Sequence, residues 1–455
     1  MPPKPSKKPT STVGASGGKP SDMIKLLHTA DIHIGVDSHG RIDPVTGQNT
    51  RLIDFRTSFD AMVETALAED IDLFLFAGDA YRTAAPTTTQ QRAFVECLKP
   101  IVDAGIPVAM IVGNHDHPVS FGKASALDIF GHLGGTLSDG KPQVRVYNRP
   151  TPDIIPTKSG DVQLFAFPWP IRSLILARDD MRGLPPNEIR DKIEELYQRF
   201  ITAYVAKERR DVPTILMGHF SVTGAELSHS ERASLIAHEP KFEVSHLVPE
   251  GSQIDYVALG HIHRHQNLNS DPDGPPVVYS SSIERVSFKE ADEQKGFVIL
   301  HLDSDGEPGK RFVPPENAHP VSRVDFRATP ARRFISVDCK VPDDTLDATR
   351  FVLDAIARHA IADAVVRVRY EIAESQAANV DKAAIRSALE TADTIAAIDR
   401  IVAPIERQRR TVVTRESSLR EAMERYVDQR EDLGTIRERL VEAALGLEAE
   451  LDGEG

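Results

Sequence analysis

The sequence predicts an α/β fold in which helices cover the faces of a sheet. From Met23 onward, short apolar runs alternate with segments whose apolar residues recur at helical spacing. Five short polar motifs each follow one of the apolar runs directly. Apolar runs of four to eight residues closed by glycine are typical of buried strands, and their alternation with helices is typical of an α/β core.

The elements of this core can be placed in order along the chain. Strands are predicted at 23–28, 71–77, 106–112, 162–167, 214–217, 256–259, 277–279 and 297–302. Helices are predicted from Phe55 to Leu67, at 90–102 and at 187–205. Together they predict one α/β domain over residues 23–303.

The remaining segments differ from this core in composition. Residues 1–22 are rich in Pro, Lys, Ser and Gly without an apolar signal core, which predicts a disordered tail. Asp, Gly, Pro and Glu dominate from 304, so residues 304–331 are expected to form a linker. Residues 332–402 show a β-α-β-α-β pattern, and residues 411–452 predict two helices with apolar faces.

Composition limits the possible functions. The 455 residues carry a formal net charge of −14, which is not the basic character expected of an autonomous nucleic-acid binder. Cys97 and Cys339 are the two cysteines, so a disulfide framework is not expected. No apolar run approaches the roughly 18 to 20 residues of a membrane span, and no segment directs export. We therefore expect a cytoplasmic protein that does not enter a membrane.

The five motifs carry the chemistry. They are Asp31-Ile32-His33, Gly78-Asp79, Gly113-Asn114-His115-Asp116, Gly218-His219 and Gly260-His261-Ile262-His263. Each motif alone is commonplace. In an α/β sheet, however, the loops that leave the carboxyl ends of the strands converge on one crevice. The motifs are therefore expected to meet.

The side chains in these motifs are ligands for divalent cations. Carboxylate, amide oxygen and imidazole together suit manganese, iron or zinc. About seven such ligands are too many for one ion and suit two ions that share a bridging carboxylate. Such a pair lowers the pKa of a bound water and clamps phosphate oxygens during in-line displacement. The motifs therefore predict phosphate-ester hydrolysis.

The order D-x-H, GD, GNHD, GH, GHxH resembles the signature of the calcineurin-like metallophosphoesterases. Finer details resemble the SbcD branch, the nuclease subunits of double-strand-break repair. They are LLHTADIHIG from Leu26, GNHDHP from Gly113, GHIHRHQ from Gly260 and YSSSIERVSF from Tyr279. The resemblance covers residues 23–300. It implies a β-sandwich with flanking helices, followed by a small capping domain over 332–402 and C-terminal helices.

The resemblance also implies a role for each motif residue. Three residues would hold the first metal: Asp31, His33 and His263. Three would hold the second: Asn114, His219 and His261. Asp79 would bridge both ions, and the ions are expected to be Mn²⁺. His115 would act at the phosphate, by stabilising the transition state or protonating the leaving oxygen. Asp116 would orient His115, or would cap a turn.

Two positions depart from the family pattern. After Gly78-Asp79 the family has a hydrophobic residue, then Phe, then Asp or His, whereas this chain has Ala80-Tyr81-Arg82. Arg82 either contacts DNA phosphate or faces solvent. Ser281 stands where the family has glycine. Both departures bear on substrate preference and on the balance of exonuclease and endonuclease action.

The resemblance implies partners as well. It implies DNA as substrate, a homodimer formed through helices of the phosphoesterase domain, and an SbcC-type SMC-like ABC ATPase bound by residues 411–452. The expected function is a metal-dependent nuclease that processes double-strand breaks or hairpins. Two alternatives stay open: a phosphoesterase acting on a small nucleotide or phosphodiester, and an inactive scaffold that tethers the ATPase to DNA.

Overall fold

The computed structural model describes residues 23–117, 123–170, 184–228, 239–316, 323–403, 418–428 and 436–453. The predicted tail, residues 1–22, lies outside these ranges. The chain divides into two compact units. The first contains the chain up to Val337 together with Ile356–Val368 and Arg386–Ile398. The second contains Asp338–Ala355, Arg369–Ile385 and the chain from Asp399 onward.

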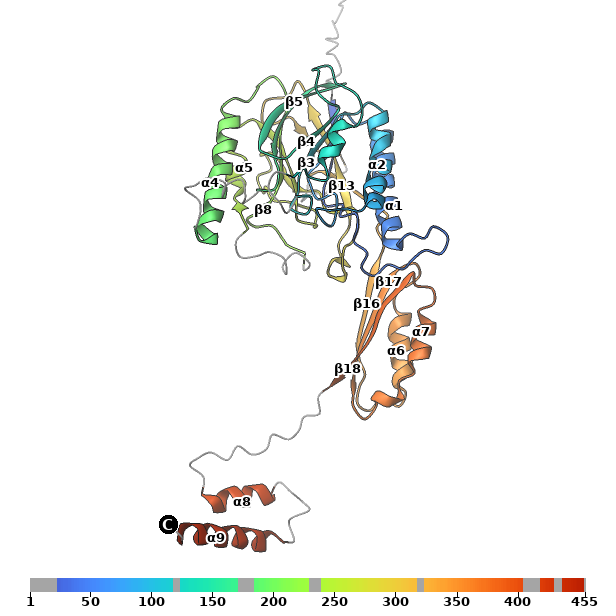
Figure 1. Cartoon of the computed structure of the whole chain (residues 1–455), viewed down its shortest axis with the longest axis vertical. Coiled ribbons are helices and arrows are strands. Elements are labelled where there is room, and N and C mark those ends of the chain that lie inside the picture. Colours follow the sequence, from blue (N-terminus) through green and yellow to red (C-terminus); the bar gives the residue numbers. More distant parts are fainter. Residues whose placement is uncertain are drawn as a thin grey trace, which may run out of the picture. The chain divides into compact units, whose positions relative to one another are not determined.

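Two sheets form the body of the first unit (Figure 1). The first sheet has the order β14-β13-β1-β2-β3-β4, with β15 paired to β13. Strands β1 to β4 run parallel, and β13 is antiparallel to β1. Its strands are β1 (Met23–Thr29), β2 (Leu73–Phe76), β3 (Val108–Ile111), β4 (Val144–Tyr147), β13 (Gly296–Asp303), β14 (Phe312–Val313) and β15 (Asp325–Ala328).

The second sheet has the order β11-β12-β10-β7-β6-β5. Strands β6, β7, β10 and β12 run parallel, whereas β5 and β11 are antiparallel edge strands. Its strands are β5 (Thr151–Thr157), β6 (Gly160–Phe167), β7 (Thr214–His219), β10 (Ile254–Gly260), β11 (Gln266–Asn267) and β12 (Val277–Tyr279). A short parallel pair, β8 (Ser221–Val222) and β9 (Lys241–Phe242), is hydrogen-bonded to neither sheet.

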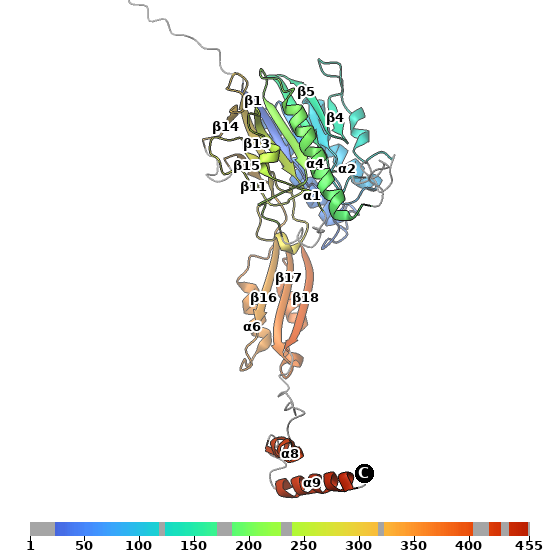
Figure 2. The same cartoon turned by 90° about the vertical axis from the view of Figure 1, so that its left-hand side faces the viewer.

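Helices cover the outer faces of this sandwich, as Figures 1 and 2 show. On the first sheet, Phe59 of α1 (Thr50–Ala68) and Phe94 of α2 (Thr88–Asp103) pack against the buried side chains of β2. On the second, Ile193 of α4 (Pro186–Val205) packs with Leu216 of β7. A third apolar cluster takes side chains from both sheets and fills the space between them. The predicted α/β sandwich with flanking helices is confirmed. A further short helix is α5 (Val244–Leu247).

The segment predicted as a linker, 304–331, contributes to the first sheet. Strand β14 pairs with β13 at Leu302 and Phe312, and β15 pairs with β13 from Gly296 to Ile299. These short strands were not predicted because Asp, Gly and Pro surround them in the sequence. They form because the edge of β13 is available for pairing, which local composition does not indicate. Strand β5 escaped prediction for a related reason: it contains Pro152 and Pro156, which an edge strand tolerates.

The elements after residue 331 follow the predicted β-α-β-α-β order. They are β16 (Phe334–Lys340), α6 (Ala348–Ala357), β17 (Val365–Ala373), α7 (Lys382–Ala388) and β18 (Thr394–Ala403), with the sheet order β16-β17-β18. The boundary between the two compact units crosses all five of these elements, for example after Val337 in β16 and after Val368 in β17. Helices α8 (Leu419–Asp428) and α9 (Arg437–Gly453) pack against each other. Residues 411–417 and 429–435 of the predicted segment 411–452 lie outside the described ranges. Across those ranges, no helix is long and apolar enough to span a membrane.

Candidate metal centre

The five motifs meet at one edge of the sandwich. Strands β1, β2 and β3 of the first sheet and β7 and β10 of the second each end in one motif. Because these strands are parallel within each sheet, their carboxyl ends lie side by side. The predicted convergence of the motifs is therefore what the fold produces.

One set of side chains gathers around His33. Its Nε2 lies 3.0 Å from Nε2 of His263, 4.0 Å from Oδ1 of Asp31 and 3.7 Å from Oδ2 of Asp79. All four residues are buried. Asp31, His33 and His263 have the ligand-atom spacing of a metal site. His33, Asp79 and His115 have it too, so the geometry by itself leaves His115 within reach of an ion.

A second set gathers around Asn114. Its Oδ1 lies 2.9 Å from Nε2 of His219 and 3.1 Å from Nδ1 of His261. The same His219 Nε2 is 3.4 Å from Oδ2 of Asp79. One oxygen of Asp79 therefore faces both sets, which is the position of a bridging carboxylate.

The backbone at this edge is held in an uncommon conformation. Asp31, His33, Asp79 and His261 have φ values of 54°, 53°, 60° and 93°, where non-glycine residues are rare and the backbone is strained. Hydrogen bonds between loops hold it there: Asp31 N–H donates to the Gly78 carbonyl (2.9 Å), and His261 N–H donates to the Asp31 carboxylate. Strain maintained by neighbouring loops is typical of functional sites.

Glycine is required where two loops approach most closely. A Cβ on Gly113 would lie 2.1 Å from Oδ1 of Asp79, and a Cβ on Gly78 would lie 2.4 Å from Nδ1 of His219. Both distances are shorter than any real Cβ contact. The motif glycines therefore allow the ligand-bearing loops to pack against one another.

Comparison with known proteins agrees with this geometry. The family model described as calcineurin-like phosphoesterase matches residues 24–265, which is more than half of the chain. The chain belongs to the calcineurin-like phosphoesterase family.

Three curated relatives are similar to a large part of this phosphoesterase. Each is named as a subunit of the nuclease SbcCD. The protein from Bacillus subtilis is 28% identical over 63% of this chain and 67% of its own length. The one from Staphylococcus epidermidis is 25% identical over 64% and 69%, and the one from Escherichia coli K12 is 25% identical over 62% and 66%.

Asp116 lies among the backbone amides of the loop that presents Asp79. Its carboxylate accepts hydrogen bonds from the backbone N–H groups of Asp79 (2.8 Å), Ala80 (3.0 Å), Tyr81 (3.3 Å) and Gly113 (3.1 Å). These bonds hold the loop that presents Asp79. These contacts are those of a turn cap, the alternative to orienting His115 that the sequence offered. Local sequence cannot separate the two roles, because three of the four partner amides lie more than 30 residues away.

Arg82 contacts the ring of His115 in the phosphoesterase. The ring Nδ1–H of His115 donates to the Arg82 carbonyl (2.9 Å), and the Arg82 guanidinium lies 3.2 Å and 3.4 Å from the two ring nitrogens. The sequence left Arg82 between a DNA contact and a solvent-facing position. The structure places this exposed side chain against His115, at the edge of the metal centre.

The electrostatics of the cluster suit a bound cation. Burial raises the pKa of Asp31 to about 6. Burial alone would lower the pKa of His219, but the Asp79 carboxylate outweighs it and raises this pKa to about 9. Burial would raise the pKa of Asp79, yet the neighbouring histidines hold it well below its ordinary value. Without a cation, these buried groups must retain a proton among them. The donor set therefore fits divalent metal ions, which displace such protons on binding.

Metal affinity is expected to rise with pH between about 7 and 9. His219, with its pKa near 9, keeps a proton at neutral pH that competes with a metal ion. One displaced proton gives about a tenfold gain in affinity per pH unit. Mn²⁺ titrations of the metal-free chain across this pH range test whether the affinity rises with pH. An affinity that stays flat, or falls as the pH rises, would contradict it.

Two neighbours of the centre were missed from the sequence. The ring of Trp169, the single tryptophan of the chain, lies 5.0 Å from the ring of His261. Trp169 follows the end of β6, so its place after a parallel strand was a usable signal. Glu290 contacts His263 from 27 residues away, and no pattern in the sequence indicated it.

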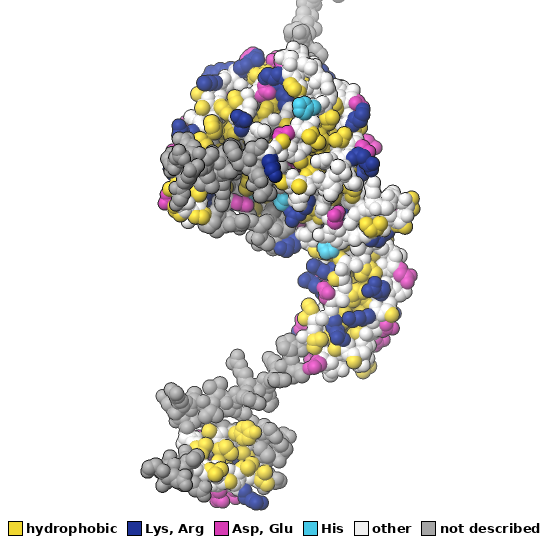
Figure 3. Space-filling model, in the orientation of Figure 1, with side chains coloured by type: hydrophobic (Ala, Val, Ile, Leu, Met, Phe, Trp, Pro, Cys, Tyr) yellow, Lys and Arg dark blue, Asp and Glu magenta, His cyan; other side chains and the backbone are white. Residues whose placement is uncertain are grey.

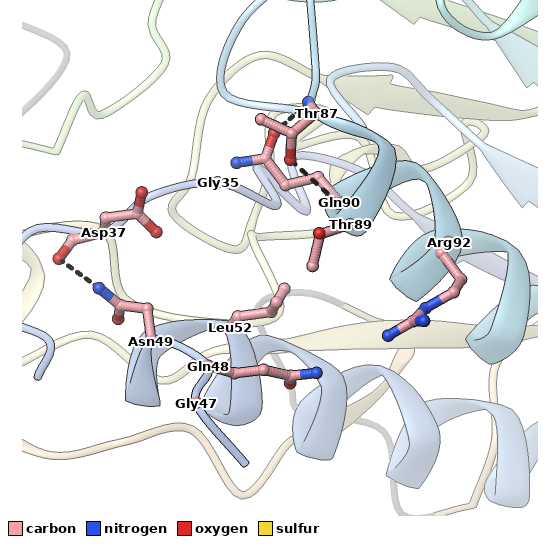
Figure 4. Close-up of a pocket in the computed structure, with 10 residues that line it drawn as sticks. All are labelled: Gly35, Asp37, Gly47, Gln48, Asn49, Leu52, Thr87, Thr89, Gln90 and Arg92. Atoms are coloured by element: carbon pink, nitrogen blue, oxygen red, sulfur yellow. Dashed lines mark hydrogen bonds between the residues drawn. The ribbon is translucent and has the colours of Figure 1, made fainter. Parts of the chain in front are cut away.

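A polar pocket lies near the centre but does not include it (Figure 4). It has a volume of about 390 Å³ and lies where α1 and α2 begin. Figure 4 shows Thr87 and Gln90 paired at the start of α2, and Asn49 turned toward the Asp37 carbonyl. None of the predicted site residues lines this pocket.

Proposed function

We propose that this phosphoesterase is a two-metal DNA nuclease that acts with an ABC ATPase subunit in the processing of double-strand breaks or hairpins. The observation that carries the proposal is the double ligand set that shares Asp79, with His115 beside it. The relatives named as nuclease subunits support DNA as the substrate.

The proposed ligand roles follow the two sets of side chains. The first ion would be held by Asp31, His33, Asp79 and His263, and the second by Asp79, Asn114, His219 and His261. Two divalent ions held by these residues, for which we propose Mn²⁺, would activate a water and neutralise charge on the phosphate.

His115 has the geometry for proton transfer at the scissile phosphate. Its Nδ1–H donates to the Arg82 carbonyl, so donation to the phosphate or to the leaving oxygen would come from a second proton on Nε2 of the protonated ring. The Arg82 guanidinium adds positive charge at the same place. A developing negative charge on the phosphate is stabilised by such donors.

The charge of the chain supports a partner that shares the DNA contact. The net charge is −14, and Figure 3 shows Lys and Arg side chains scattered among acidic and apolar ones on the visible face. DNA binding draws most of its affinity from cations that neutralise phosphates. We therefore propose that an SbcC-type ATPase supplies much of that surface, and that the nuclease itself works as a homodimer.

Cleavage of end-labelled double-stranded, single-stranded and hairpin DNA in Mn²⁺ tests the nuclease. Cleavage that EDTA stops and added Mn²⁺ restores is the expected result. A folded protein with two bound metals that cleaves no DNA, even with the ATPase present, would contradict the proposal. Hydrolysis of bis(p-nitrophenyl) phosphate by that protein would then identify a small-substrate phosphoesterase, the alternative that the acidic balance favours.

Deleting residues 411–455 is expected to abolish binding of the ATPase and leave the metal content unchanged. Helices α8 and α9 lie in this segment, whereas every proposed metal ligand precedes it. Amphipathic helices dock into apolar grooves of partners. Co-purification with the ATPase, together with metal analysis of the truncated chain, tests the prediction. A truncated chain that still binds the ATPase would refute it.

A further inference from the structure

A buried ion pair lies directly behind one of the proposed metal ligands. Glu290 and Lys295 are 0% and 2% exposed, and their charged groups are 3.0 Å apart. Glu290 closes a short 3-10 helix, Phe288–Glu290, and Lys295 precedes β13. Burying two charges costs several kcal/mol in desolvation for each ion, so such a pair is a poor device for stability alone.

The pair holds His263 at two points. Oε1 of Glu290 accepts a hydrogen bond from Nδ1–H of the His263 ring (2.9 Å). The ammonium of Lys295 donates to the His263 carbonyl (3.1 Å), and the hydroxyl of Ser281 donates to the same carbonyl (2.8 Å). Both the ring and the backbone of this residue are thereby fixed.

The contact with Glu290 also decides which ring nitrogen carries the proton. A carboxylate cannot donate, so the proton of the neutral imidazole lies on Nδ1 and the lone pair on Nε2. This Nε2 lies 3.0 Å from Nε2 of His33, within the first ligand set. The second set has a different arrangement, in which His219 Nδ1 is bound to the neutral carbonyl of Ala77 (2.6 Å).

We propose that Glu290, held in place by Lys295, is a positioning residue that fixes the tautomer and direction of His263 and thereby sets the affinity of the first metal site. The proposal rests on the proposed metal centre and makes a selective claim within it. The site formed by Asp31, His33 and His263 depends on Glu290, and the site formed by Asn114, His219 and His261 does not. Carboxylates behind ligating histidines orient the ring and raise its basicity.

Two double variants isolate the hydrogen bond from the buried charges. Glu290→Gln/Lys295→Met removes both charges but keeps an amide oxygen that can accept from His263 Nδ1–H. Glu290→Leu/Lys295→Met removes the charges and the acceptor together. Both variants also remove the partner of Glu293, whose carboxylate lies 2.8 Å from the Lys295 ammonium, and because this loss is common to both it does not affect their comparison. Mn²⁺ titration calorimetry of the metal-free chains gives the affinities of the two sites, and His263→Ala identifies which binding event belongs to the first.

The leucine double variant is expected to weaken the first binding event about 10- to 100-fold, with the second unchanged. The glutamine double variant is expected to keep most of the affinity that the leucine double variant loses. Thermal unfolding without metal shows whether both chains are folded. Equal affinities in the two variants, whether equal to the wild type or equally reduced, would overturn the proposal. A wild-type chain that binds no Mn²⁺ would instead refute the metal centre itself.

Discussion

Replacing Asp79 with asparagine is expected to abolish DNA cleavage and to remove both tightly bound metal ions. Oδ2 of Asp79 lies 3.7 Å from Nε2 of His33 and 3.4 Å from Nε2 of His219, so its charge serves both ligand sets. An asparagine keeps Oδ1 as the acceptor for the His115 N–H (2.8 Å), and the loop is therefore expected to stay folded. Metal analysis of the dialysed protein, together with the DNA cleavage assay, measures the effect.

Asp72 offers a matched control for this substitution. It is a buried carboxylate at the opposite end of the same strand, where it accepts a hydrogen bond from the Lys25 N–H (2.7 Å). Asp72→Asn removes a comparable buried charge far from the motifs and is expected to retain both metals. If Asp79→Asn also retained both ions, Asp79 would not be the bridging ligand.

Replacing His115 with asparagine is expected to reduce kcat for DNA cleavage about 100- to 10,000-fold, with little change in metal content. The ring lies beside the ligand sets, 4.8 Å from the ring of His33 between centroids, and is oriented by the Arg82 carbonyl. An asparagine side chain cannot supply a proton in the transition state. Single-turnover cleavage and metal analysis separate the catalytic role from a ligand role.

His132→Asn is the control, because His132 is an exposed histidine at the end of the short helix Asp128–His132. This variant should cleave DNA at the wild-type rate. Loss of one metal from His115→Asn would contradict the proposed role and make His115 a ligand, which its spacing to His33 and Asp79 permits.

The sequence predicted the positions of the motifs well, for a physical reason. A motif that follows a parallel strand is placed by the sheet, so its spatial neighbours are known once the strands are known. That reasoning brought His33 and His263 together across 230 residues. The burial of β2, whose four residues are all apolar, likewise follows from composition.

Contacts made by irregular loops could not be predicted from the order of the strands. The partners of Asp116 and the approach of Glu290 to His263 depend on the paths of loops that no periodicity describes. The position of Arg82 against His115 depends on a loop of the same kind. Strands β14 and β15 were missed because they form by pairing with β13, which their own sequence does not indicate.

The hydrogen bonds that join the ligand-bearing loops make the centre a mutually dependent structure. The backbone N–H of Asp31 donates to the Gly78 carbonyl. The N–H of His261 donates to the Asp31 carboxylate, and the N–H of His115 donates to the Asp79 carboxylate. A single loop transplanted to another scaffold would have backbone amides without acceptors and a strained backbone conformation. It would therefore not reproduce the ligand geometry. The smallest transferable unit is therefore the pair of sheets with all its loops, which is why one isolated motif in a sequence says little and the full series says much.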